Sequence, residues 1–159
     1  MKPTIFAKWL KIVIAGTTLI GLVCCIYAIP FVMEAFKTEY PEFTNWVIPW
    51  KVLIYICAVP CFIAMGVSWK IATNIQKDRS FCMENALLFK TFSYLALGDS
   101  VFFMCGSVFF FIKGMNHPGL MIIELLVVFA GLAVFVCTAA LSYLVAQAAD
   151  LKEDADLTI

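Results

Sequence analysis

KIATNIQKDRSFCMENALLFK, residues 70–90, decides the fold, because this polar stretch separates two pairs of long apolar runs. The apolar runs span about residues 10–33, 50–70, 91–112 and 120–147. Each run supplies the ~20 largely apolar residues that an α-helix needs to cross a bilayer. The sequence therefore predicts an all-α, polytopic membrane protein in which four transmembrane helices form two helical hairpins.

The composition supports a membrane protein. Hydrophobic residues make up 64% of the 159 residues and charged residues only 14%, whereas soluble domains are roughly half apolar and about a quarter charged. A soluble fold of this size could not bury so much apolar surface, but lipid can cover it. We expect one transmembrane domain over residues 1–159, with residues 70–90 as a connector and residues 148–159 as an acidic tail.

The lysines and arginines predict the orientation, because they are enriched in cytoplasmic loops. One side would carry eight of them: Lys2, Lys8, Lys11, Lys70, Lys77, Arg79, Lys90 and Lys152. The other side would carry three: Lys37, Lys51 and Lys113. This asymmetry predicts that both termini, the connector and the tail lie in the cytosol.

The residues that common enzymes need are scarce. The chain has a single histidine and no glycine-rich phosphate loop, which excludes histidine-based triads and multi-histidine metal sites. Its seven cysteines include no C-x-x-C pair and are interpreted as small hydrophobic residues. They are Cys24, Cys25, Cys57, Cys61, Cys82, Cys105 and Cys137. We therefore expect no enzyme, no metal and no cofactor, and the formal net charge of zero gives no reason to expect direct nucleic-acid binding.

Two carboxylates, Asp99 and Glu124, fall inside the apolar runs. Charged groups in the bilayer are costly and often functional, so both are candidates for an intramembrane polar site. Helix geometry places them at depths that differ by about 10 Å, which argues against a direct pair. Asp99 is equally compatible with a structural hydrogen bond and with a proton or ligand site, and Glu124 with an acid near the outer interface. Pro60 is expected to kink the second helix.

Two short polar motifs carry a family resemblance. Asp78 to Ala86 forms D-R-S-F-x-x-E-N-A, in which Ser80 is placed to cap the third helix, and Leu151 to Ile159 forms L-K-E-D-A-D-L-T-I. These motifs and the four spans resemble the DUF2975 family of bacterial membrane proteins, in which G-x-P-F-x-x-E-N leads into the third helix and chains end close to L-x-E-E-N-D-L-T-I. Asp78, Ser80 and Ala155 depart from that pattern. The matching residues are Phe81, Glu84, Asn85, Asp156, Leu157, Thr158 and Ile159.

The resemblance implies that the protein lies in a bacterial plasma (inner) membrane and has a partner on the cytosolic side. Family members are often encoded beside a small helix-turn-helix regulator, which implies a membrane-bound partner or antagonist of a transcription factor. The predicted cytosolic contact residues are Asp78, Arg79, Phe81, Glu84, Asn85, Asp156, Leu157, Thr158 and Ile159. We expect a non-enzymatic regulatory or sensory module whose partners are the lipid bilayer and such a regulator. A small proton-coupled transporter that uses Asp99 and Glu124 is the alternative, and homo-oligomerisation stays open.

Overall fold

The computed structural model describes residues 3–157, apart from the side chains of residues 3, 43, 156 and 157. Within this range the regular structure is entirely helical. Four helices are long and apolar enough to cross a membrane: Thr4–Glu39, Thr44–Gln76, Met83–Ile112 and Pro118–Ala155. The prediction of an all-α fold with four membrane-length helices is confirmed.

The first membrane-length helix contains a short π-helical segment next to Pro30. It consists of α1 (Pro3–Val23), a π-helical segment η1 (Cys24–Ala28) and α2 (Ile29–Glu39). In the π pattern the Ile29 N–H donates to the Cys24 carbonyl, five residues back. The next donor would be Pro30, which has no N–H, and the Tyr55 hydroxyl donates to the Cys25 carbonyl instead, at 2.8 Å. A side chain of the neighbouring helix thus satisfies the carbonyl that Pro30 leaves without a backbone donor.

The other helices also extend beyond the predicted spans. A short 3-10 segment, η2 (Pro41–Trp46), leads into α3 (Val47–Gln76), which continues through Pro60. It is followed by α4 (Met83–Ile112) and α5 (Pro118–Leu157). The predicted connector 70–90 is therefore mostly helical, and only residues 77–82 between α3 and α4 are not. The 40 residues of α5 give a helix of about 60 Å, twice the ~30 Å of a hydrocarbon core.

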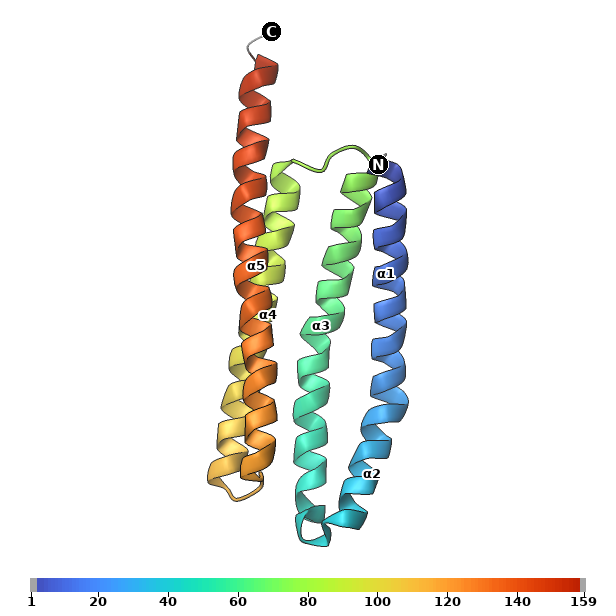
Figure 1. Cartoon of the computed structure of the whole chain (residues 1–159), viewed down its shortest axis with the longest axis vertical. Helices are drawn as coiled ribbons and strands as arrows, with labels where there is room; N and C mark the ends of the chain where they lie inside the picture. The colour runs from blue at the N-terminus through green and yellow to red at the C-terminus, as the bar shows by residue number, and fades with distance from the viewer. Residues whose placement is uncertain (1–2, 158–159) are drawn as a thin grey trace.

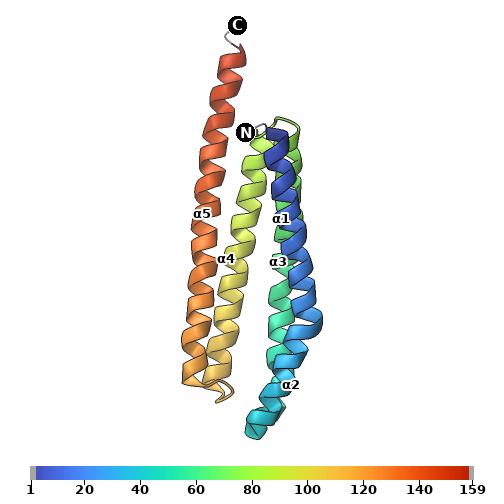
Figure 2. The ribbon, with the colours of Figure 1, turned by 45° about the vertical axis from the view of Figure 1, so that its right-hand side comes forward.

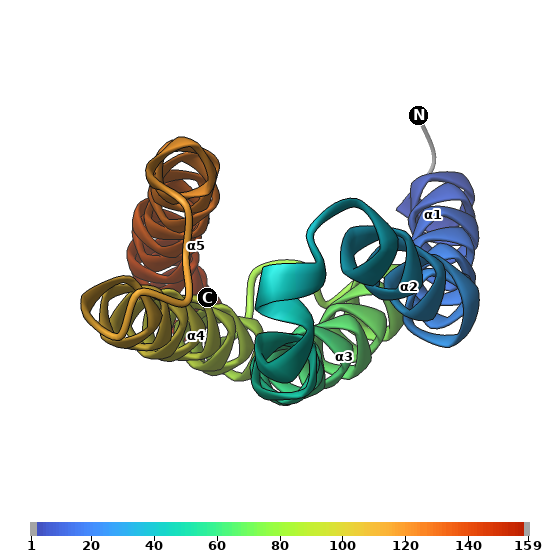
Figure 3. The same cartoon turned by 90° about the horizontal axis from the view of Figure 1, so that it is seen from below.

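The helices follow one another in a bent row. The main interfaces in the described part of the chain join α1 to α3, α3 to α4 and α4 to α5, which confirms the two hairpins. Seen along the helix axes, α5 and the α1/α2 rod rise on the same side of α3 and α4 (Figure 3). Figures 1 and 2 show α5 projecting beyond the other helices at the end that carries residues 77–82, called here the connector end. The opposite end, with η2 and residues 113–117, is called the turn end.

Small residues set the closest helix contacts. Gly131 of α5 lies directly against Ser100 of α4, and a Cβ on Gly131 would collide with the Ser100 hydroxyl. Gly106 of α4 likewise lies against Leu53 of α3, whose methyl carbons would be 2.7 and 2.8 Å from a Cβ there. Because lipid offers no hydrophobic driving force between helices, such close approach favours their association.

Candidate functional site

The end of α3 adopts a defined cap at the connector end. The Asp78 N–H donates to the Ile75 carbonyl at 3.1 Å, and the Arg79 N–H donates to the Asn74 carbonyl at 3.0 Å. These two bonds form a Schellman motif, which requires a left-handed residue between the helix and the following chain. Asp78 holds that position with a φ of 60°. Asp78 therefore occupies the left-handed position of the cap, where glycine is the favoured residue.

Asp78→Gly is expected to raise the free energy of unfolding by about 0.5–1 kcal/mol, because glycine adopts positive φ without the Cβ clash. Reversible unfolding in mixed micelles measures the change. Asp150→Gly, on the exposed C-terminal part of α5, is the control and should lower stability, since glycine is unfavourable inside a helix. A decrease for Asp78→Gly would show that the aspartate side chain stabilises the cap by more than its backbone strain costs.

Asn85 holds the connector together. Its side chain is only 1% exposed, and its Nδ2 donates to the carbonyl oxygens of Arg79 at 3.1 Å and Ser80 at 2.9 Å. Its Oδ1 accepts a hydrogen bond of 2.9 Å from Nδ2 of Asn74, which is also buried. One amide therefore joins the last turn of α3, the connector and the first turn of α4.

This network moves the start of α4 away from the position expected for it. The N-cap of α4 is Cys82, without a side-chain cap bond, so the expectation that Ser80 caps this helix is wrong. Since Asn85 binds the backbone carbonyls of Arg79 and Ser80, the chain stays non-helical until Cys82. Glu84, in the first turn, pairs with Lys70 of α3 at 3.1 Å.

The motif residues therefore separate into two groups. Asn85 and Glu84 make contacts within the protein, whereas Asp78, Arg79 and Phe81 are exposed. Phe81 is 59% exposed. Its exposure leaves it available to a partner.

A cleft of about 320 Å³ brings the two sequence motifs together. Its walls are Phe81, Cys82 and Met83 on one side, and Ala149, Asp150, Lys152 and Glu153 of α5 on the other. Lys152 and Glu153 belong to the terminal motif. Its residues Asp156 and Leu157 also belong to α5, while Thr158 and Ile159 lie outside the described residues. Segments about 70 residues apart in the chain thus share one surface at the connector end.

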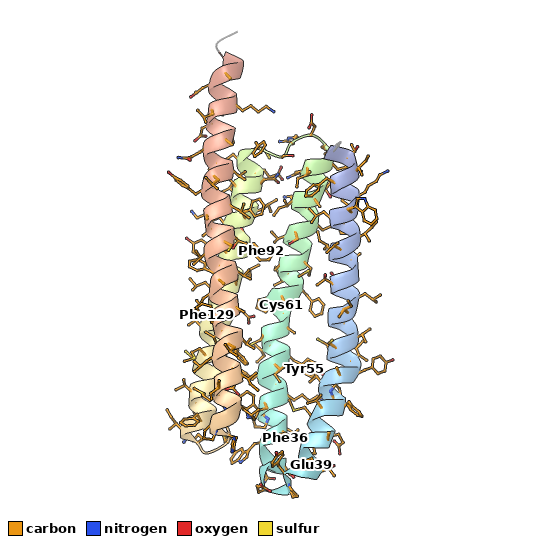
Figure 4. The ribbon with its side chains drawn as sticks, viewed as in Figure 1. Phe36, Glu39, Tyr55, Cys61, Phe92 and Phe129 are labelled. Carbon is orange, nitrogen blue, oxygen red and sulfur yellow. The ribbon has the colours of Figure 1, made fainter. Side chains whose placement is uncertain are left out.

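Asp99 lies in a second, apolar cavity. Cys61 donates to Asp99 Oδ2 over 3.7 Å, and Oδ1 is buried without a hydrogen-bond partner. The cavity of about 480 Å³ is lined by α3, α4 and α5, and Phe92, Phe103 and Val127 are among its walls. Figure 4 labels Cys61 of α3 and Phe92 of α4. A carboxylate oxygen without a partner in an apolar cavity is costly and open to a ligand or a proton.

Glu124 belongs to an adjoining cavity at the turn end. Its Oε2 accepts a hydrogen bond of 2.7 Å from Asn116 Nδ2 in the α4–α5 turn. Its cavity, of about 250 Å³, shares Ile54, Phe103 and Val127 with the cavity that holds Asp99. The two carboxylates therefore line two adjoining cavities. Within residues 3–157, no three His, Cys, Asp or Glu side chains gather so as to hold a metal ion.

Sequence reasoning did not identify all of this. Three features were not predicted: the hydrogen bond between Asn116 and Glu124, the internal role of Asn85, and the aromatic walls of the cavity that Glu124 lines. Asn85 had one usable signal: asparagine in the first turn of a helix often binds nearby backbone carbonyls or N–H groups. The aromatic walls gave none, because Trp46 and Trp50 come from a different hairpin than Glu124.

The comparisons with known proteins agree with a membrane protein. The uncharacterized membrane protein YoaS of Bacillus subtilis (strain 168) is 27% identical over 158 residues, which cover 98% of this chain and 97% of the relative. No solved structure matches this chain. A model of one family matches residues 31–159, which include both polar motifs. The chain therefore belongs to the family described as protein of unknown function (DUF2975).

Proposed function

We propose that this protein is a non-enzymatic membrane module that docks a cytosolic regulator of the helix-turn-helix class. The observation that carries the proposal is the cleft between residues 81–83 of the connector and residues 149–153 of α5. It combines an exposed phenyl ring with acidic side chains, a combination typical of a protein contact surface with an apolar centre and a polar rim.

The charge of α5 supports this class of partner. The end of α5 carries Asp150, Glu153, Asp154 and Asp156, against one base, Lys152. A helix-turn-helix protein presents lysines and arginines to the DNA backbone. An acidic helix that projects beyond the other helices (Figure 1) would bind this basic surface and compete with DNA for the regulator.

The positive-inside rule supports the orientation that this proposal requires. The connector end must face the cytosol, and eight of the eleven lysines and arginines in the sequence come from the N-terminal segment, the connector and the tail, which we assigned to that side. The bacterial plasma membrane is the compartment in which the cleft would meet a transcription regulator.

Crosslinked membranes test the docking proposal. Phe81→Ala should reduce capture of the regulator about tenfold, the size of a loss at an interface hot spot, and removal of Ala149–Ile159 should abolish it. Phe6→Ala, which removes another exposed phenyl ring at the connector end, is the matched control and should leave capture unchanged. Unchanged capture and unchanged target transcription after the truncation would contradict the proposal.

A second candidate function is proton-coupled transport, favoured by the unpartnered Oδ1 of Asp99 in its apolar cavity. The same set of variants separates the two functions. Asp99→Asn leaves the cleft intact, so it should not alter capture of a regulator if docking is the function. If transport is the function, Asp99→Asn should abolish flux in proteoliposomes, while the Ala149–Ile159 truncation should leave flux unchanged.

A further inference from the structure

The cavity at the turn end has the chemistry of an ammonium site. Four aromatic residues, one each from α2, η2, α3 and α4, line it together with the carboxylate of Glu124; they are Phe36, Trp46, Trp50 and Phe103. We propose that this cavity binds the alkylated ammonium head group of a single-chain amphiphile. This site does not rest on the proposed docking function, which concerns the opposite end of the protein.

One of the aromatic walls, Trp50, is held in place before any ligand arrives. The indole Nε1 of Trp50 donates to the Met115 carbonyl at 3.1 Å, which ties α3 to the α4–α5 turn. The Trp50 ring lies against the Phe110 ring with a centroid separation of 4.7 Å. A fixed indole face near a carboxylate attracts a quaternary ammonium by cation–π interaction, which needs no hydrogen-bond donor on the ligand.

Glu124 supplies the charge that selects a cation. It is the only charged residue among those lining the cavity, and the group that donates a hydrogen bond to it is the neutral amide of Asn116. Two lysines at this end of the protein lie against aromatic rings instead. The Nζ of Lys113 is 5.9 Å from the Phe109 ring centroid, and the Nζ of Lys51 is 5.8 Å from the Tyr55 ring centroid. One carboxylate without a basic partner among the described side chains matches one monovalent cation.

The adjoining cavity accounts for the apolar chain. Ile54, Phe103 and Val127 line both cavities, so the ammonium cavity adjoins the larger one of about 480 Å³. The walls of the larger cavity are almost entirely apolar side chains, apart from Asp99, Ser100 and two cysteines. An alkyl chain fits this space, whereas a bare metal ion would need several oxygen ligands that the walls do not offer.

Titration of the full chain in phosphatidylglycerol nanodiscs tests the proposal, with hexyltrimethylammonium as the probe. The charged probe should bind at least tenfold more tightly than 1-hexanol, an alcohol of the same chain length. Glu124→Gln keeps an acceptor for Asn116 and should weaken binding about tenfold. Trp46→Leu, which leaves the carboxylate in place, should weaken it several-fold. The control is Glu42→Gln, which neutralises an exposed acid of the same end outside the cavity walls, and it should bind as the unmodified protein does.

Three results would overturn the proposal. The first is equal binding of the charged and the uncharged probe. The second is unchanged binding by both cavity variants when their melting temperatures show that they are folded. The third is loss of probe binding in nanodiscs that contain phosphatidylcholine but not in those that contain phosphatidylethanolamine, which would assign the cavity to a lipid head group instead of a single-chain amphiphile. None of these results alters capture of a regulator at the connector end, so this test and the docking test fail separately.

Discussion

Asn85→Asp is expected to lower the free energy of unfolding by about 2–4 kcal/mol, because a buried amide that donates to two part-buried carbonyl oxygens is replaced by a side chain that donates to neither. The aspartate keeps the acceptor that Asn74 binds but loses both N–H donors, which reach the carbonyl oxygens of Arg79 and Ser80. A carboxylate would also face these two carbonyl oxygens in a site that is almost fully buried, and the repulsion adds to the loss.

Unfolding in mixed micelles measures this change, with Asn45→Asp as the matched control. Asn45 is exposed in η2, so the same exchange there should change stability by less than about 0.5 kcal/mol. We also expect the connector to become a site of proteolytic cleavage in Asn85→Asp, because residues 77–82 lose their attachment to α4. Equal stability of the two variants would show that the connector is held by the Schellman cap alone.

Gly131→Val should separate α4 from α5 and lower stability by about 3 kcal/mol, at the upper end of the range for overpacking a close contact. A Cβ on Gly131 already collides with the Ser100 hydroxyl and stands 3.4 Å from the Ser100 Cβ. A branched side chain cannot be accommodated by rotating the serine alone, so the helices must move apart.

The control for this contact is Gly16→Val in α1, where a Cβ would meet nothing within 4 Å. It should change stability little, although both exchanges insert the same side chain into an apolar helix. Gly131→Val with Ser100→Ala should recover part of the loss, because the second exchange removes the hydroxyl that collides. A loss that is the same with and without Ser100→Ala would locate the clash elsewhere.

The four membrane-length helices could be predicted because hydropathy acts on each helix separately. Every turn in the bilayer must be covered by apolar side chains, whichever neighbour it later contacts. For the same reason the positions of the helix ends were harder to predict. The continuation of α2 to Glu39 and of α5 to Leu157 takes place in polar sequence, where hydropathy gives no information about helix formation.

The candidate sites depend on contacts between segments distant in the chain, which a single sequence does not encode locally. The motif that contains Phe81 and Asn85 could be recognised in the sequence. The two residues have opposite roles, since Phe81 is exposed and Asn85 is buried in contacts within the protein, and the sequence motif does not distinguish these two positions. Glu124 could be singled out as a carboxylate in an apolar run. Its position in a cavity with Trp46 and Trp50 depends on how the two hairpins pack, which apolar runs of similar composition do not specify.

The unbroken course of α5 has a mechanical consequence. Ser142 of α5 donates to the Ala86 carbonyl of α4 at 2.7 Å, and from that contact to the cleft at Glu153 the helix rises about 16 Å without an internal proline. A rotation of about 10° around that contact would move Glu153 by about 3 Å relative to Phe81. Helices that are longer than the bilayer is thick respond to thinning by tilting, so we expect a change in membrane thickness to change the width of the cleft.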